Sequence, residues 1–181
     1  MSVCDITSGF TLGCRDNTGG DKNIYILSGS ISTLTGAENG LITDIDGYGT
    51  LYKFELVKET ADHTETITVS EENGTVFYET ALNAAFHKMQ SATRNQVKVL
   101  AKNPNLKIII ETNNGSEDGV GKFFLMGQEN GASLTAGTGA SGKAFGDMNG
   151  YSLTFTAKEP NPMCELSGSA LAGVLTGIDI A

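Results

Sequence analysis

The sequence predicts a mainly β fold, an antiparallel β-sandwich or barrel with one α-helix and long loops. Three observations predict it. Short segments that alternate apolar and polar residues recur along the chain. Gly, Asn and Asp separate them, and the 23 glycines among 181 residues exceed the usual share of about 7%. A single segment has helical periodicity, so neither βαβ alternation nor a parallel sheet is expected.

A hairpin is expected near the start of the chain. Phe10–Cys14 and Asn23–Ser28 are extended segments, and residues 15–22 between them hold consecutive glycines that can close a turn. Residues 29–50 are expected to form a long flexible connection.

Two alternating strands are expected in the middle of the chain. Leu51–Lys58 places Tyr, Phe and Leu on one face and polar residues on the other, which predicts a strand with one wet face. Thr75–Lys88 alternates in the same way, and the Asn73-Gly74 pair before it is a strong reversal signal. Residues 59–74, rich in Thr and acidic residues, are expected to form a second long connection up to that turn.

One helix is expected at Ser91–Lys102. Ser91 is its expected N-cap, Val97 and Leu100 recur on one face, and Asn103-Pro104 stops it.

Three further strands follow the helix. Leu106–Glu111 is a β-branched run that predicts a strand buried on both faces, with Lys122–Met126 as its partner. Tyr151–Lys158 alternates again, with Tyr, Leu, Phe and Ala facing inward. Residues 128–149, rich in Gly, Ala, Ser and Thr, are expected to be a third long loop.

The whole chain, residues 1–181, is expected to form one domain with flexible arms at about 1–9 and about 166–181. The start, Met1–Phe10, has no basic region followed by an apolar one, so no signal peptide is expected. No run approaches the 18 apolar residues of a membrane span. We therefore expect a protein made and assembled in a cytoplasm.

Charge and cysteine content exclude several functions. The chain carries 21 acidic and 12 basic residues, a net charge of −9. The basic residues are expected to be scattered singly, and both features argue against a nucleic-acid clamp. Cys4, Cys14 and Cys164 are an odd number without a CxxC pair. They are therefore expected to be reduced thiols rather than disulfides or zinc ligands.

Two motifs suggest ligand sites but depart from their patterns. Gly137–Ala144 nearly spells a phosphate-binding loop, yet Ala144 stands where a Mg²⁺-binding hydroxyl is needed, so no nucleotide is expected. Asp44, Asp46 and Glu55 match positions of a calcium loop, but Tyr48 occupies a ligand position. A hairpin tip with solvated acids is the favoured interpretation, and no metal or other cofactor is expected.

No catalytic constellation stands out in the sequence. The two histidines, His63 and His87, lie in a polar segment and near a strand end, and both are expected to be exposed and without a role. No GxSxG nucleophile motif accompanies them. The chain is therefore expected not to be an enzyme, and no catalytic residue is predicted.

Four segments resemble the tail tube (major tail) proteins of tailed bacteriophages, in the divergent form of phages of Bacteroides-type hosts. They are Cys14–Ile26, Glu72–Met89, Phe123–Gly131 and Gly142–Pro162. The resemblance implies a β-sandwich or barrel with one helix, whose sheets join those of neighbouring copies into a sixfold ring with a continuous inner barrel. It also implies stacked rings, contacts to other tail and neck proteins, and a virion location.

The expected function is thus structural: a homo-oligomeric, negatively charged conduit through which DNA passes without specific binding or a membrane partner. Two other classes stay open. One is a different virion component, such as a head-to-tail connector ring or a capsid-decorating protein. The other is a carbohydrate-binding or hydrolytic β domain, for which Tyr48 beside Asp44 and Asp46 is the candidate site.

Overall fold

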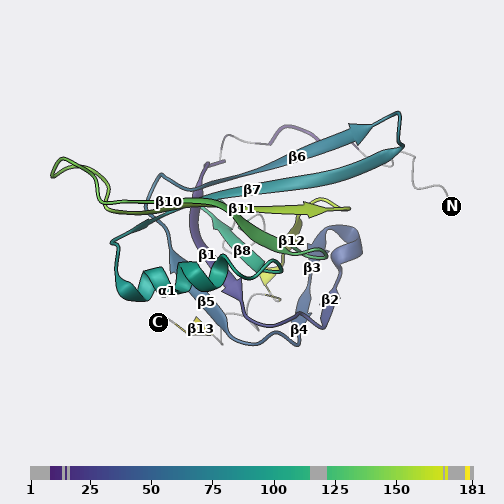
Figure 1. Ribbon diagram of the computed structural model, residues 1–181. Helices are drawn as coiled ribbons and strands as arrows, with labels where there is room; N and C mark the ends of the chain where they lie inside the picture. Colours follow the sequence, from purple (N-terminus) through teal and green to yellow (C-terminus); the bar gives the residue numbers. More distant parts are fainter. Residues whose placement is uncertain are drawn as a thin grey trace.

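The computed structural model describes residues 9–13, 15, 17–114, 122–168, 170 and 178–179. The fold is mainly β, as predicted, with one α-helix beside antiparallel sheets (Figure 1). None of the helices in the described part of the chain is long and apolar enough to cross a membrane.

The larger sheet has seven strands in the order β13-β5-β1-β8-β9-β12-β3. Their bounds are Ile178–Asp179 (β13), Leu51–Glu55 (β5), Asp21–Leu27 (β1), Lys107–Thr112 (β8), Phe123–Met126 (β9), Cys164–Leu166 (β12) and Leu41–Ile42 (β3). Neighbouring strands are antiparallel except at the two margins, where β13 pairs with β5 and β3 pairs with β12 in parallel.

The second sheet has four antiparallel strands in the order β10-β11-β7-β6. Their bounds are Ala132–Ala140 (β10), Gly150–Glu159 (β11), Thr75–His87 (β7) and Asp62–Ser70 (β6). A small third sheet pairs β2 (Thr33–Thr35) with β4 (Asp44–Asp46), and a 3-10 helix, η1 (Ala37–Asn39), precedes β3. The α-helix α1 spans Ser91–Leu100.

The main core lies between the two larger sheets. Alternate residues of β1 and β8, such as Ile24 and Ile108, face Leu82 of β7 and Phe155 of β11, and all four side chains are fully buried. The helix α1 closes one end of this core with Leu100. Side chains of one face of each sheet therefore exclude water together, which is the main stabilisation available to two half-apolar sheets.

A second core covers the opposite face of the larger sheet. Tyr25 of β1, Ile109 of β8 and Leu125 of β9 pack there against Ile42 and Ile45 from the segment before β5. The strand β8 is consequently buried along its whole length, as its run of β-branched residues predicts.

The four-stranded sheet is longer than the sheet beneath it. In Figure 1 the turn between β6 and β7 extends beyond one end of the molecule, and the turn between β10 and β11 extends beyond the other. The strand β7 alone has 13 residues, a length of about 43 Å at 3.3 Å per residue. Both ends of this sheet therefore lack the cover that its middle receives.

The strands expected from alternation and the single helix are confirmed. β5, β7, β8, β9 and β11 occupy the predicted segments within a few residues, and the Asn73-Gly74 turn joins β6 to β7 with Gly74 at φ +62°. The N-cap is Gln90 rather than Ser91, and no side chain caps the helix there.

Other predictions of elements were wrong. Residues 10–13 form no strand, and Phe10 and Leu12 are fully exposed, so the hairpin with residues 23–28 does not form. Instead β1 lies inside the larger sheet between β5 and β8, because both of its faces are apolar: Ile24 and Ile26 enter the main core, and Tyr25 and Leu27 pack on the opposite face.

The three expected flexible connections contain paired strands. Residues 29–50 hold β2, η1, β3 and β4, residues 59–74 hold β6, and residues 128–149 hold β10. The polar strands β6 and β10 are held by backbone pairing with β7 and β11, which requires no apolar alternation of their own.

The expected C-terminal arm begins inside the fold. Leu166 is buried in β12, and residues 178–179 pair with β5. Of the expected N-terminal arm, residues 1–8 lie outside the described residues, as do Cys4 and Cys14.

Candidate assembly surfaces

The β6–β7 hairpin exposes apolar side chains beyond the end of the larger sheet. Ile67, Val69 and Val76 are 61%, 63% and 50% exposed. Val69 lies directly opposite Val76, and Ile67 lies opposite Tyr78, so the strand register puts all four on one face. That face continues the one that buries Leu82 further along β7. The hairpin thus carries an extension of the core face without the sheet that covers it elsewhere.

The same hairpin is strongly acidic. From residue 62 to residue 87 the chain has five acidic side chains and no Lys or Arg. They are Asp62, Glu65, Glu71, Glu72 and Glu79. Two of them lie in the turn at its tip, which joins the strands at the far end of the sheet. The projecting β6–β7 hairpin therefore has one apolar face, and all of its Asp, Glu, Lys and Arg side chains are acidic.

A groove of about 620 Å³ lies at the other end of β7, between β5 and α1. Its apolar lining comes from Phe54, Leu56, Phe86, Val97, Leu100 and Leu153. Its further lining includes Tyr52, Thr93 and Gln96, and the paired charges of Lys53 and Glu55. The groove lies where α1 packs on the end of the main core and leaves a space between itself and β5.

Basic residues concentrate in the segment that contains α1, the helix that forms one wall of this groove. Residues 88–102, which contain α1, carry Lys88, Arg94, Lys98 and Lys102 and no acidic residue. Four of the twelve basic residues thus fall in fifteen positions, which corrects the expectation that they are scattered singly. The acid-only hairpin and base-only helix segment are visible in the sequence as charge blocks, a signal that the sequence reasoning missed.

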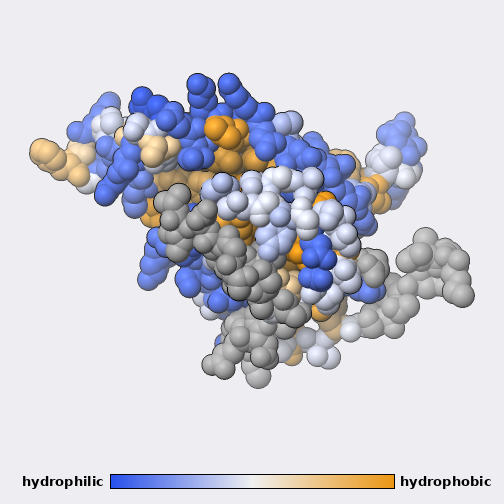
Figure 2. Space-filling model, turned by 90° about the horizontal axis from the view of Figure 1, so that it is seen from below, coloured by the Kyte–Doolittle hydropathy of each residue, from blue (hydrophilic) through white to orange (hydrophobic). Residues whose placement is uncertain are grey.

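The β10–β11 turn is a third exposed apolar feature. Phe145 is fully exposed and Met148 is 38% exposed. Figure 2 shows hydrophobic colour at the tip of the corresponding left-hand projection. This turn also holds the second half of the Gly137–Ala144 motif, whose first half lies in β10.

The geometry of that motif differs from a phosphate loop. The Asp147 carboxylate accepts the backbone N–H groups of Lys143 at 2.7 Å and Ala144 at 2.8 Å, and these bonds lower the pKa of Asp147. The strand β11 follows rather than a helix, so no helix N-terminus faces the loop. The Asp147 carboxylate therefore already accepts the backbone N–H groups that a phosphate would need as donors.

The four-stranded sheet ends in edge strands on both sides. In the described residues, β6 pairs with no strand besides β7, and the outer edge of β10 has one backbone bridge, from Ala132 to Leu106 at the start of the strand. Unpaired N–H and C=O groups along such edges can pair with another copy. Most of these two edges therefore has no strand partner within the described part of the chain.

His63 forms an ion pair, contrary to the expectation that it is exposed and without a role. Its Nδ1 lies 2.9 Å from Oδ1 of Asp21, whose side chain is 1% exposed. The hydrogen bond to Asp21 is the main cause that raises the pKa of His63. The pair joins β6 of one sheet to β1 of the other. His87 is exposed at the end of β7, as expected.

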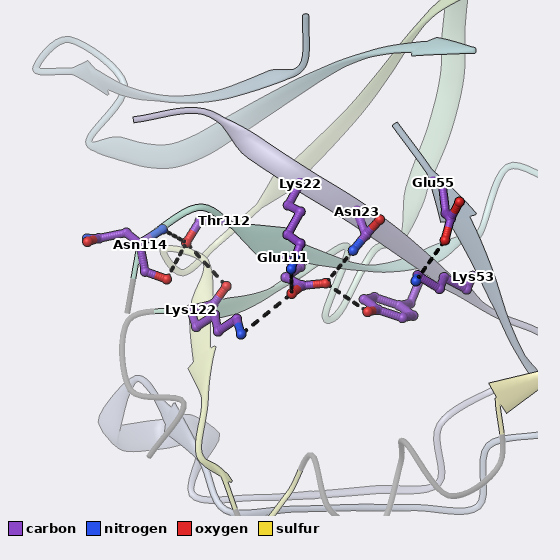
Figure 3. A network of polar contacts seen from close by, with 9 residues as sticks. Lys22, Asn23, Lys53, Glu55, Glu111, Thr112, Asn114 and Lys122 are labelled. Atoms are coloured by element: carbon purple, nitrogen blue, oxygen red, sulfur yellow. Dashed lines mark hydrogen bonds and ion pairs between the residues drawn. The ribbon is translucent and has the colours of Figure 1, made fainter. Parts of the chain in front are cut away.

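A buried carboxylate lies at the centre of the polar cluster in Figure 3. Oε2 of Glu111 accepts hydrogen bonds from Nδ2 of Asn23 at 2.7 Å and from the Tyr25 hydroxyl at 2.8 Å. Lys22 and Lys122 each place Nζ 3.6 Å from its Oε1. Burial opposes ionisation, but these hydrogen bonds and charges together lower the pKa of Glu111. Its partners are all within the fold, so the cluster is structural.

The calcium-loop candidates do not converge on a site. Asp44 and Asp46 are exposed on β4, where Asp44 accepts the N–H of Ile45. Glu55 lies on β5 and pairs with Lys53 at 3.1 Å. Among the described residues, no group of three or more His, Cys, Asp or Glu side chains is placed to hold a metal ion.

Tyr48, the candidate for sugar stacking, is half-buried and packs against the second core. Cys164 is buried, and burial raises the pKa of its thiol, so it has the environment of a structural cysteine.

Comparisons of this chain with family models, with curated proteins and with solved structures found no match.

Proposed function

We propose that this chain is a self-assembling structural subunit, and that its assembly is the tail tube of a tailed bacteriophage. The observation that carries the self-assembly is the bare apolar face of the β6–β7 hairpin at Ile67, Val69 and Val76. Burying such side chains is worth about 1.5–3 kcal/mol each. A second surface that covers them would therefore stabilise an oligomer substantially.

Sheet edges support the same proposal. Lateral pairing of β6 with β10 of a neighbouring copy would continue the four-stranded sheet around a closed ring, which removes both edges. Repetition of one such contact closes a ring when the rotation between copies is right. This is the ring plan that the resemblance to tail tube proteins implies.

The outer face of the four-stranded sheet would then line the bore. Strand register assigns to it many hydroxyl-bearing side chains, among them Thr64, Thr66, Ser152, Thr154 and Thr156. Its charged side chains include Asp62, Glu79 and Lys158, and the last two pair at 3.4 Å. Such a bore is polar and weakly negative rather than strongly so. A surface without unpaired cations gives DNA phosphates little to bind.

Electron microscopy and light scattering on the purified protein test the proposal. Concentrated protein should form rings or stacked-ring tubes of uniform diameter. A single monomeric species at millimolar subunit concentration would overturn it. Closed rings that never stack would favour the second candidate, a head-to-tail connector or decoration component, which the same apolar hairpin also supports.

A further inference from the structure

We infer that the β6–β7 hairpin of one copy docks into the groove between β5 and α1 of the next copy, head to tail. This inference rests on the proposed self-assembly and names the contact that carries it. The hairpin face is defined by Ile67, Val69 and Val76, and the groove by the lining residues given above.

The two surfaces match in polarity. The hairpin presents three aliphatic side chains that are half or more exposed, and the groove presents six apolar side chains around about 620 Å³ of open space. Each surface is open to water in the isolated chain. Contact between them would remove apolar area from water on both sides at once.

The two surfaces also match in charge. The hairpin from residue 62 to residue 87 carries five acidic residues and no Lys or Arg, and residues 88–102 carry four basic residues and no acid. Two of those acids, Glu71 and Glu72, lie in the hairpin turn. Arg94 and Lys98 lie on α1, which forms one wall of the groove, and Nε of Arg94 donates to the Tyr151 hydroxyl at 3.5 Å. Opposite charge steers the right partner and like charge rejects wrong orientations, since two hairpins or two helices would repel each other.

The contact cannot form within one chain. The hairpin tip and the groove lie at opposite ends of β7, about 43 Å apart at 3.3 Å per residue over 13 residues, so one chain cannot dock on itself. Figure 1 shows the β6–β7 turn and α1 at opposite ends of the molecule. Different surfaces on the two partners make the contact heterologous, and such contacts build rings or filaments rather than closed dimers.

Two complementary defective variants test this geometry. The first, Ile67→Asp with Val69→Asp, spoils the hairpin at exposed positions. The second, Thr93→Glu with Gln96→Glu, places acids in the groove at helix positions that tolerate Glu. For each variant alone, the protein concentration at half-maximal assembly should rise by more than about tenfold, because the substitution places an unpaired charge in a contact that excludes water. Circular dichroism checks that both stay folded.

Mixing the two variants gives the decisive result. The mixture is made at a concentration where each variant alone is monomeric, so that β6–β10 edge pairing by itself does not assemble the chain. There the intact hairpin of the second variant should fill the intact groove of the first, and the complex should stop at a 1:1 heterodimer because its remaining hairpin and groove are both defective. Sedimentation velocity measures the stoichiometry. Matched controls are Thr75→Asp, exposed on β7 on the other face of the hairpin, and Val99→Glu, which is exposed on α1 outside the groove, and both should assemble like wild type.

Several outcomes overturn the inference while leaving the proposed function intact. Wild-type rings or tubes together with unimpaired assembly of either variant would show that this contact is dispensable. A mixture without a heterodimer, or one that forms long polymers, would exclude the head-to-tail pairing and leave the groove to another occupant, such as a small apolar ligand. A monomeric wild type would overturn both proposals.

Discussion

Nδ1 of His63 lies between the two carboxylate oxygens of Asp21, 2.9 Å from one and 3.0 Å from the other, and thereby ties the projecting β6–β7 hairpin to the larger sheet. The acids Asp62 and Glu65 on the same strand also favour the charged imidazole, while burial opposes it. The backbone N–H of Asp21 donates to Ala61 just before β6, so the junction is held twice.

This pair predicts a pH-dependent contribution to stability. The pKa of His63 is raised above its ordinary 6.5, so the contribution is complete below that value and is lost as the pH rises through the folded-state pKa. Replacing His63 with Gln should cost about 1–2 kcal/mol at pH 5.5 and clearly less at pH 9. Urea denaturation of both proteins at the two pH values measures it. His87→Gln, at an exposed position, is the control and should show no such trend. An equal cost for His63→Gln at both pH values would contradict the prediction.

Glu111 predicts the opposite pH trend. Its pKa is lowered below its ordinary 4.5 by Asn23, Tyr25 and two lysines, so its contribution is present above that value and is lost as the pH falls through the folded-state pKa. Glu111→Gln should therefore be destabilised by about 3 kcal/mol at pH 7 and by less at pH 3.

Tyr25→Phe tests the same cluster from the other side. It removes the hydroxyl that donates to Glu111 at 2.8 Å and should cost about 1–2 kcal/mol at pH 7. Denaturant titration measures each variant. A Tyr25→Phe protein as stable as wild type would show that the Glu111 carboxylate finds another donor.

The sequence predicted the strands whose side chains enter a core, and it missed strands that are held mainly by backbone pairing. Alternation located β7 and β11, and the β-branched run located β8, because their side chains enter a core. It missed β10, where Gly137 and Gly139 leave no side chain to alternate.

It also missed β6, because apolar residues alternate only at Ile67 and Val69, while the first half of the strand is polar on both faces. The role of His63 was invisible for a different reason: its partner Asp21 is 42 residues away and is brought near only by the packing of the two sheets.

The Gly137–Ala144 segment is predicted to bind no nucleotide. Its amides at Lys143 and Ala144 are already bonded to Asp147, and Ala144 offers no hydroxyl for Mg²⁺. Calorimetric titration with ATP and Mg²⁺ should give no heat of binding. Asp147→Ala frees the two amides and is the more sensitive test, and it too should give none because β11 follows the turn instead of a helix. A stoichiometric heat with either protein would contradict this.

Two neighbouring residues of β11 are predicted to differ in their effect on stability. Phe155 is fully buried between the sheets, so Phe155→Ala should cost about 3–5 kcal/mol through lost burial and a residual cavity. Thr154 points to the opposite face, where its hydroxyl donates to Oδ1 of Asn83 at 3.0 Å. Thr154→Ser keeps that donor and should change stability by no more than about 0.5 kcal/mol. Chemical denaturation compares them, and similar losses would contradict the two-faced strand.

The same strand carries the functional half of this prediction. If the outer face lines a DNA conduit, Thr154→Lys should leave assembly intact while placing a cation at every copy of this position around the bore. Phosphates passing such a ring would be retained electrostatically, most strongly at low salt, where the Debye length is about 30 Å at 0.01 M. DNA ejection from virions that carry Thr154→Lys should therefore slow, and added salt should restore the rate. Val99→Lys, at an exposed position on α1 outside the proposed bore, is the matched control. An ejection rate that is unchanged at low salt would show that Thr154 does not line the bore, because a ring of added cations beside DNA would attract its phosphates at that salt concentration.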